Sequence, residues 1–172
     1  MEISTVSIKE LRAQCGAGIM ECRNALQQAR GDIEKALEAL KEQGWLRAAK
    51  KAERATAQGL VEAYIHTGGR IGAMIELNCE TDFTARTDEF RELAHNLAMQ
   101  VAAMCPQFVS KEDVPKEADV EVETACLLQQ PYIKDPSMSV QDVIVQTIAR
   151  VGENIKVSRF ARFELGSKAA TK

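Results

Sequence analysis

IGAMIELNCETDFTARTDEF, residues 71–90, is the stretch that decides the fold of this chain. The apolar residues of its first half alternate with polar or small ones; they are Ile71, Ala73, Ile75, Leu77 and Cys79. This alternation is the period of a strand with one face in a core. Four residues that favour turns follow: Asn78, Glu80, Thr81 and Asp82. We therefore predict a strand that ends near Asn78, an acidic turn and then a helix.

Phe83 lies among polar neighbours at the tip of this turn. It has no apolar partner at strand or helix spacing on its N-terminal side. Its ring is therefore either folded back under the next helix or exposed for a partner. We interpret Asp82-Phe83 as a contact point for another protein.

The helix predicted after the turn has a clear beginning. Thr87 is a suitable N-cap, and Asp88 and Glu89 place negative charge in the first turn, where the helix dipole favours it. The apolar stripe, which runs to about Met104, consists of Phe90, Leu93, Ala94, Leu97, Ala98 and Val101. We expect this stripe to pack on the sheet.

Alternation predicts two more strands. Residues 60–66 would direct Val61, Ala63 and Ile65 inward. A two-residue Gly-Gly loop would place these three on the sheet face opposite the first apolar set, whereas a three-residue loop, residues 68–70, places both sets together. We predict the longer loop. The third strand, residues 154–165, has its expected core face at Ile155, Val157, Ala161, Phe163 and Leu165.

The segment between the long helix and the third strand is less regular. Residues 116–128 are predicted as a helix, and residues 129–138, with two prolines, as a structured loop. Ser139, with Asp142 three residues later, then opens another helix that Gly152 ends. Three antiparallel strands packed with helices make this part an α+β core.

The first 45 residues predict three short helices. Ser7 has Glu10 at the capping-box spacing, although the first helix could equally begin from Ser4 or Thr5. A Gly-Ala-Gly turn at residues 16–18 separates it from the second helix.

The stripe of the second helix consists of Ile19, Cys22, Leu26 and Ala29. The third helix is capped by Asp32 and ends at Gly44. Met20 lies off the second stripe, and periodicity gives equal weight to an exposed contact and to packing against the third helix. Residues 45–57 then read as a helical connector whose basic side chains form a solvated face.

Composition restricts the classes of function. With 172 residues, 45% of them hydrophobic, and a net charge of -3, the chain reads as a globular protein without the positive field that nucleic acids require. No window approaches the roughly 20 apolar residues of a membrane span, and the start lacks the features of a signal peptide. We expect a cytoplasmic protein that binds neither nucleic acid nor membrane.

Residues suited to catalysis or metal binding are sparse. The five scattered cysteines form no CxxC pair and are interpreted as small buried hydrophobes. Neither His66 nor His95 has metal-ligand spacing, and no phosphate-binding glycine motif is present. The carboxylates of Glu76, Glu80 and Asp82 have no nucleophile nearby. We expect no metal, no cofactor and no enzymatic reaction.

Several motifs, in order, resemble a known family. They are KELR at 9–12, GAG at 16–18, GDIEKA at 31–36, AAKKA at 48–52, NCETDF at 78–83 and GENIKVSRFARF at 152–163. This series is similar to translation elongation factor Ts. The resemblance implies a guanine-nucleotide exchange factor for elongation factor Tu, with an N-terminal ubiquitin-associated-like helical domain and an antiparallel-sheet core.

The resemblance also implies the contact residues. Asp82 and Phe83 would press beside the nucleotide site of the partner, with Thr81 shaping the turn. The implied docking residues of the helical domain are Lys9, Arg12, Ile19 and Met20. The family usually has threonine at Cys15, methionine at Ile19 and valine at Thr84, so packing near these positions departs from its pattern.

The expected organisation is a helical domain at 1–45, a connector at 46–58, a core at 59–166 and a flexible tail at 167–172. Larger family members duplicate the core, so a chain with one core resembles half of theirs, and we expect a homodimer. The alternative function is a ubiquitin-associated-like adaptor without exchange activity. In that case the first 55 or so residues alone would account for most of the binding.

Overall fold

The structure is a computed structural model that describes residues 3–167. The tail predicted at 167–172 lies, apart from its first residue, outside the described residues. The chain divides into two compact units. The helical unit comprises residues up to 54 together with 145–154, and the sheet unit comprises 55–144 together with the residues from 155 onward. Each unit is described separately.

The helical unit contains the three predicted N-terminal helices, α1 (Thr5–Cys15), α2 (Ile19–Gln28) and α3 (Ile33–Lys51). One buried cluster in this unit consists of Leu11, Cys22, Ala25, Leu26 and Ala36. The Ser4 hydroxyl accepts a hydrogen bond from the Ser7 amide (3.0 Å) and caps α1. Of the alternative starts that the sequence left open, the structure has Ser4 as the cap and not the Ser7 capping box. A helix that starts at Thr5 already contains Ser7, so that residue is no longer at an end.

The third helix does not end at Gly44, which corrects the prediction. Gly44 is buried inside α3, which continues to Lys51. The cost of an interior glycine, about 1 kcal/mol, is offset because Ala48 extends the buried side of the helix. The residues after Gly44 are mostly alanine, lysine and arginine, which favour helix. The Asp32 cap is confirmed by its hydrogen bond from the Lys35 amide (3.1 Å).

Residues 145–154 hold the end of α3. The buried Asn154 amide donates to the carbonyl oxygens of Ala52 (3.3 Å) and Arg54 (3.0 Å). These bonds satisfy carbonyl groups that have no partner within the helix. The preceding helix, α7 (Val140–Val151), begins at the predicted Ser139 box and ends before Gly152.

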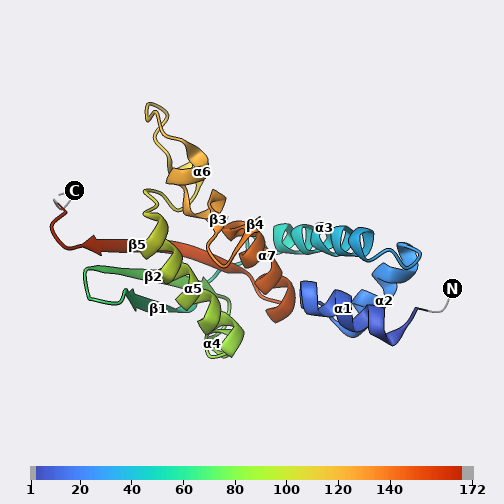
Figure 1. Ribbon diagram of the computed structural model, residues 1–172. Coiled ribbons are helices and arrows are strands. Elements are labelled where there is room, and N and C mark those ends of the chain that lie inside the picture. Colours follow the sequence, from blue (N-terminus) through green and yellow to red (C-terminus); the bar gives the residue numbers. More distant parts are fainter. Residues whose placement is uncertain (1–2, 168–172) are drawn as a thin grey trace. The chain divides into compact units, whose positions relative to one another are not determined.

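The sheet unit contains three antiparallel strands in the order β1-β2-β5 (Figure 1). They are β1 (Gln58–Ile65), β2 (Ile71–Cys79) and β5 (Ile155–Glu164). Helix α5 (Asp88–Met104) packs across one face. The predicted face of β2 and the predicted stripe of α5 are confirmed; their fully buried large residues are Ile75, Leu77, Phe90, Leu97 and Val101.

The hairpin between β1 and β2 has the opposite register from the predicted one. Tyr64 pairs with Ala73 and Ile65 with Gly72, so an even number of residues separates each pair. Val61, Ala63 and Ile65 therefore lie on the face away from α5. The core-side positions of β1 carry Glu62 and Tyr64, which are only half-buried. The Glu62 carboxylate contacts His95, and the Tyr64 hydroxyl contacts His66. These contacts let the two polar side chains occupy the edge of the core.

A bulge in β5 corrects the second strand prediction. Glu76 pairs with Arg159, but the next residue, Leu77, pairs with Val157, which leaves Ser158 as the extra residue. Ile155 and Val157 are on the core side, as predicted. After Ser158 the alternation shifts by one residue, so Phe163 lies on the opposite face.

The segment from Cys105 to Ser139 is mostly short elements, and the helix predicted over 116–128 is wrong except for α6 (Val122–Ala125). The other elements are η1 (Lys111–Asp113), η2 (Leu127–Gln129), β3 (Pro131–Tyr132) and β4 (Asp135–Ser139). The buried Gln100 amide group organises the segment, since it donates to Gln130 Oε1 (3.1 Å) and accepts from the Ile133 amide (2.8 Å). These long-range bonds replace the regular helical pattern.

Candidate partner-binding site

The predicted acidic turn is a single helical turn, α4 (Asp82–Ala85), between β2 and α5 (Figure 1). The Thr81 hydroxyl accepts a hydrogen bond from the Thr84 amide (3.4 Å) and caps its start. At its end the Thr87 hydroxyl donates to the Thr84 carbonyl (2.9 Å), while Thr87 also caps α5. The turn is therefore fixed at both ends by threonine side chains.

One side of α4 is buried and the other is exposed. Thr84 and Ala85 are 6% and 9% exposed, whereas Phe83 is 80% exposed. Of the two alternatives for its ring, the structure has the exposed one. Leaving a phenylalanine in water forgoes about 1.5–3 kcal/mol of burial. An exposed ring on a fixed turn is typical of a contact site.

Asp82 is paired with a residue that the sequence reasoning did not select. Its carboxylate lies 2.9 Å from Arg86, four residues later, and both side chains are more than half exposed. This spacing is a known stabilising pair on helices and could have been found in the sequence. A partner that contacts Asp82 therefore meets a carboxylate already oriented by a guanidinium group.

The acidic residue of β2, Glu76, also has a structural partner. The Arg159 guanidinium donates to Glu76 (2.7 Å), and this hydrogen bond, together with one from Asn78, lowers the pKa of that carboxyl. Glu76 is thus held as an anion rather than as an acid. Within residues 3–167, no group of three or more potential ligands could hold a metal ion. In that same part, no helix is long and apolar enough to cross a membrane.

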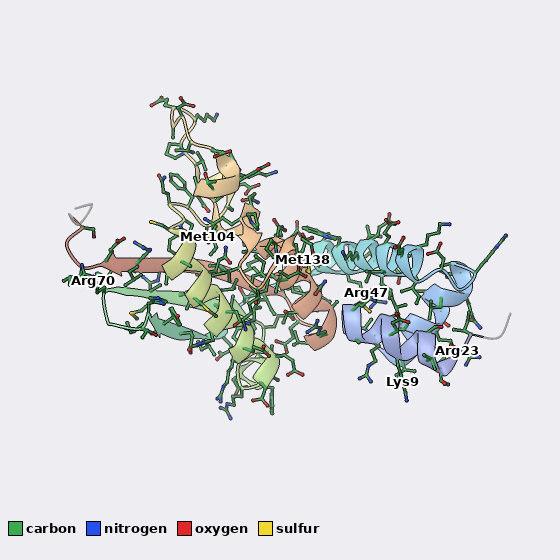
Figure 2. The ribbon with its side chains drawn as sticks, in the orientation of Figure 1. Lys9, Arg23, Arg47, Arg70, Met104 and Met138 are labelled. Atoms are coloured by element: carbon green, nitrogen blue, oxygen red, sulfur yellow. The ribbon has the colours of Figure 1, made fainter. Side chains whose placement is uncertain are left out.

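The docking residues implied for the helical unit are all exposed. Lys9 and Arg12 lie on α1, and Figure 2 shows Lys9 projecting outward. Ile19 is 56% and Met20 59% exposed at the start of α2. The placement of Ile19 on the buried stripe is wrong, because Ala25 completes the stripe instead. For Met20 the structure selects the exposed alternative.

Glu21 fixes the turn that presents Ile19 and Met20. Its carboxylate accepts hydrogen bonds from Arg47 on α3 (2.5 Å) and from the Gly18 amide (3.0 Å). The Arg47 hydrogen bond is the main reason that the pKa of Glu21 is lowered. Arg47 lies on a solvated face, as expected, and in addition orders the start of α2.

The sheet face away from α5 carries exposed apolar side chains, and all of them except Met74 were predicted to lie in the core. This open sheet face consists of Val61 (59%), Ile65 (66%), Met74 (47%), Phe163 (69%) and Leu165 (66%). A cluster of this kind marks an interaction surface. Its signal in the sequence was the alternative Gly-Gly loop, which gives the observed parity. The α4 turn and the open sheet face belong to the sheet unit, and the other exposed set belongs to the helical unit.

Comparisons with known proteins identify relatives over nearly the whole chain. The family model described as "Elongation factor TS" matches residues 17–125. An elongation factor Ts of Carboxydothermus hydrogenoformans is 45% identical over 201 aligned positions, covering 99% of this chain and 92% of that protein. Those of Thermotoga neapolitana and Thermotoga maritima are each 48% identical and cover 98% and 96% of this chain, and 100% and 98% of their own lengths.

Proposed function

The chain belongs to the elongation factor Ts family, and from this premise we propose that it is a guanine-nucleotide exchange factor in translation. It binds elongation factor Tu carrying GDP and promotes release of the nucleotide. It acts in the cytoplasm, and it does so by protein binding rather than by catalysing a covalent reaction. The observation that carries this proposal is Phe83, which is 80% exposed on a turn fixed at both ends.

The proposed mechanism is a wedge. Phe83 enters the partner beside its magnesium and phosphate site, with Asp82 next to it and Thr81 holding the turn. A packed interior does not deform continuously, so an inserted ring shifts an element between discrete arrangements. The exchange factor binds the empty partner more tightly than the loaded one, and by linkage it weakens GDP binding by the same factor.

The helical unit supplies the anchoring contacts in this proposal. Lys9 and Arg12 provide positive charge for an acidic surface, and Ile19 and Met20 provide apolar area. Methionine suits such a surface because its flexible thioether adapts to the partner. Anchoring raises the local concentration of the wedge at its target.

The test is the rate of GDP release from elongation factor Tu, followed by stopped flow with a fluorescent GDP analogue. Phe83→Ala should slow the stimulated release at least about tenfold, which corresponds to about 1.4 kcal/mol of lost coupling. Met104→Ala is the matched control, since Met104 is another exposed apolar side chain (45%) outside the proposed surfaces. Unchanged release with Phe83→Ala would refute the wedge.

We also propose that the protein is a homodimer whose second copy covers the open sheet face. Five large apolar side chains exposed on one sheet are costly in water, and two copies of the same face bury them mutually. Sedimentation equilibrium should give a dimer mass, and Phe163→Asp should give the monomer mass. A concentration-independent monomer mass for the unmodified chain would contradict this proposal.

A further inference from the structure

Two cysteine side chains meet at the junction of α1 and α2. Cys15 is the last residue of α1 and is half-buried, and Cys22 is fully buried in α2. Their sulfur atoms are 3.8 Å apart. The sequence did not indicate this pair. Six residues separate the two cysteines, which lie in different helices, and helical spacing does not predict which side chains meet across the turn between two helices.

The turn between the two cysteines contacts both sulfurs. The Ala17 amide donates to Cys15 Sγ (3.5 Å), and Cys22 Sγ lies 3.8 Å from the Ala17 carbonyl oxygen. Gly16 has the left-handed backbone conformation (φ 65°), so the chain reverses here within a few residues. The remaining cysteines are at other places: Cys79 on β2, Cys105 after α5 and Cys126 after α6.

We propose that Cys15 and Cys22 are a redox-active dithiol that a low-molecular-weight disulfide of the glutathione type oxidises to an intramolecular disulfide. The bond requires about 2.05 Å between the sulfurs, so the two atoms must approach from 3.8 Å. Side-chain rotation of the half-buried Cys15 is the readiest motion toward this distance.

The reaction balances in two exchange steps. The Cys15 thiolate attacks one sulfur of the small disulfide, forms a mixed disulfide and releases one thiolate. Cys22 then loses its proton to solvent and attacks the Cys15 sulfur, which forms the Cys15–Cys22 bond and releases the second thiolate. The two cysteines give up two electrons, and the small disulfide is reduced to two thiols.

Accessibility sets the order of these steps. Burial, and secondarily the adjacent Cys15, raises the pKa of Cys22 to about 11, so this thiol is a poor first nucleophile. Cys15 is the more exposed of the two and meets the oxidant first. Cys22 acts as the resolving thiol because its sulfur is already adjacent.

The test uses the full chain, reduced and then incubated folded with oxidised glutathione. After denaturing alkylation and tryptic digestion, both cysteines lie on one peptide, AQCGAGIMECR, residues 13–23. We expect this peptide to be unalkylated and lighter by two hydrogen atoms than its reduced form. A doubly alkylated peptide from the oxidised folded protein would overturn the proposal.

Single variants test the order of attack. Cys22→Ser should stop at the Cys15–glutathione mixed disulfide, and Cys15→Ser should leave Cys22 as a free thiol. Cys105→Ser, which removes an exposed cysteine elsewhere, should still form the bond. If Cys22 in the Cys15→Ser variant forms a mixed disulfide with glutathione at the rate seen for Cys15, the proposed order is contradicted. This test does not depend on whether Cys22→Ser folds well, because it is made in the other variant.

One consequence rests on the proposed function, because Ile19 and Met20 lie within the ring that the disulfide closes. The oxidised chain should stimulate GDP release more slowly, and dithiothreitol should restore the rate. Equal rates for both forms, with the disulfide shown by mass, would refute this coupling. Absence of stimulation by the reduced chain would instead refute the proposed function.

Discussion

The α4 turn and the start of α2 both expose apolar side chains, but the two regions support them differently. Phe83 lies on a turn capped by Thr81 and Thr87, between a strand and a helix with several fully buried large residues. Met20 lies at the start of α2, next to a small buried cluster in which Leu11 and Leu26 are the large apolar residues. In the proposed function, the first region presents its side chain rigidly and the second makes an adaptable contact.

This difference teaches that exposure alone does not define the role of a contact residue. A wedge has to transmit force into a partner, so its support must not yield. An anchor only has to bury area, so a flexible side chain on a small domain suffices. Phe83 and Met20 are both more than half exposed, but in the proposed function this exposure serves two different roles.

The largest expected effect tests whether the two cores differ in strength. Leu26→Ala and Leu97→Ala each delete a fully buried leucine and should lower the free energy of unfolding by about 2–5 kcal/mol. Because the helical core is small, Leu26→Ala should open that unit alone, whereas Leu97→Ala should leave a folded but weakened sheet unit. Hydrogen exchange read by mass spectrometry separates the two. If Leu26→Ala lowered the protection of backbone amides from exchange equally in both units, the helical unit would have no stability of its own.

The next effect concerns adaptable contact. Met20→Ala should weaken binding to elongation factor Tu about tenfold, or about 1.4 kcal/mol, because it deletes exposed apolar contact area. Met20→Leu, which keeps that area, should bind nearly as well as the unmodified chain, as measured by calorimetry. Neither change should alter the unfolding midpoint, since Met20 is 59% exposed. A large loss in Met20→Leu would indicate a rigid pocket instead of an adaptable surface.

Local patterns predicted much of the fold correctly. The buried face of β2, the stripe of α5 and the caps at Asp32, Thr87 and Ser139 depend on residues within one or two turns of each other. Phe83 was selected for the same reason, since its lack of an apolar neighbour is visible in the sequence.

The wrong strand predictions arise where a shift of one residue in strand pairing moves side chains to the other face of the sheet. In β1 the loop parity, and in β5 the extra residue Ser158, each move alternate side chains to the other face. Hydrophobic alternation cannot decide the parity when both faces of a strand carry apolar residues, as they do here. The open sheet face was missed for this reason.

Other omissions involve contacts between distant residues. Arg47 reaches Glu21 across 26 positions, and Gln100 reaches Gln130 across 30. No periodicity relates such positions, so the order at the start of α2 and in the segment after α5 was not predictable. Arg86 differs, because its pairing with Asp82 is local and could have been recognised.

A smaller effect tests whether the α4 turn must be rigid. Thr81→Ala removes the cap and should cost about 1 kcal/mol of stability, leaving Phe83 present on a frayed turn. Stimulated GDP release should then be slower than in the unmodified chain but faster than in Phe83→Ala. Thr81→Ser keeps the hydroxyl and should behave as the unmodified chain does. Equal rates for the alanine and serine variants would show that rigidity of the turn is unimportant.

The smallest effect concerns how firmly the start of α2 is held. The Arg47 hydrogen bond, followed by that of Gly18, lowers the pKa of Glu21 below 4.5 in the folded state. The unfolded chain therefore binds a proton more readily, so this contribution to stability is fully present above about pH 4.5 and is lost as pH falls through the lowered pKa. Because 37% of the Glu21 side chain is exposed, solvent screening limits the contribution to about 0.5 kcal/mol.

Thermal unfolding of the unmodified chain and of Glu21→Gln, compared between about pH 3 and pH 6, measures this contribution. The glutamine keeps an acceptor for the Gly18 amide but has no charge for Arg47. Asp32, whose pKa is also lowered, through its hydrogen bonds with Lys35, is present in both proteins and cancels in the difference. The difference in unfolding midpoint between the unmodified chain and Glu21→Gln should shrink as the pH falls. A difference that stays constant would mean that Glu21 acts through packing, and that the start of α2 is held without its charge.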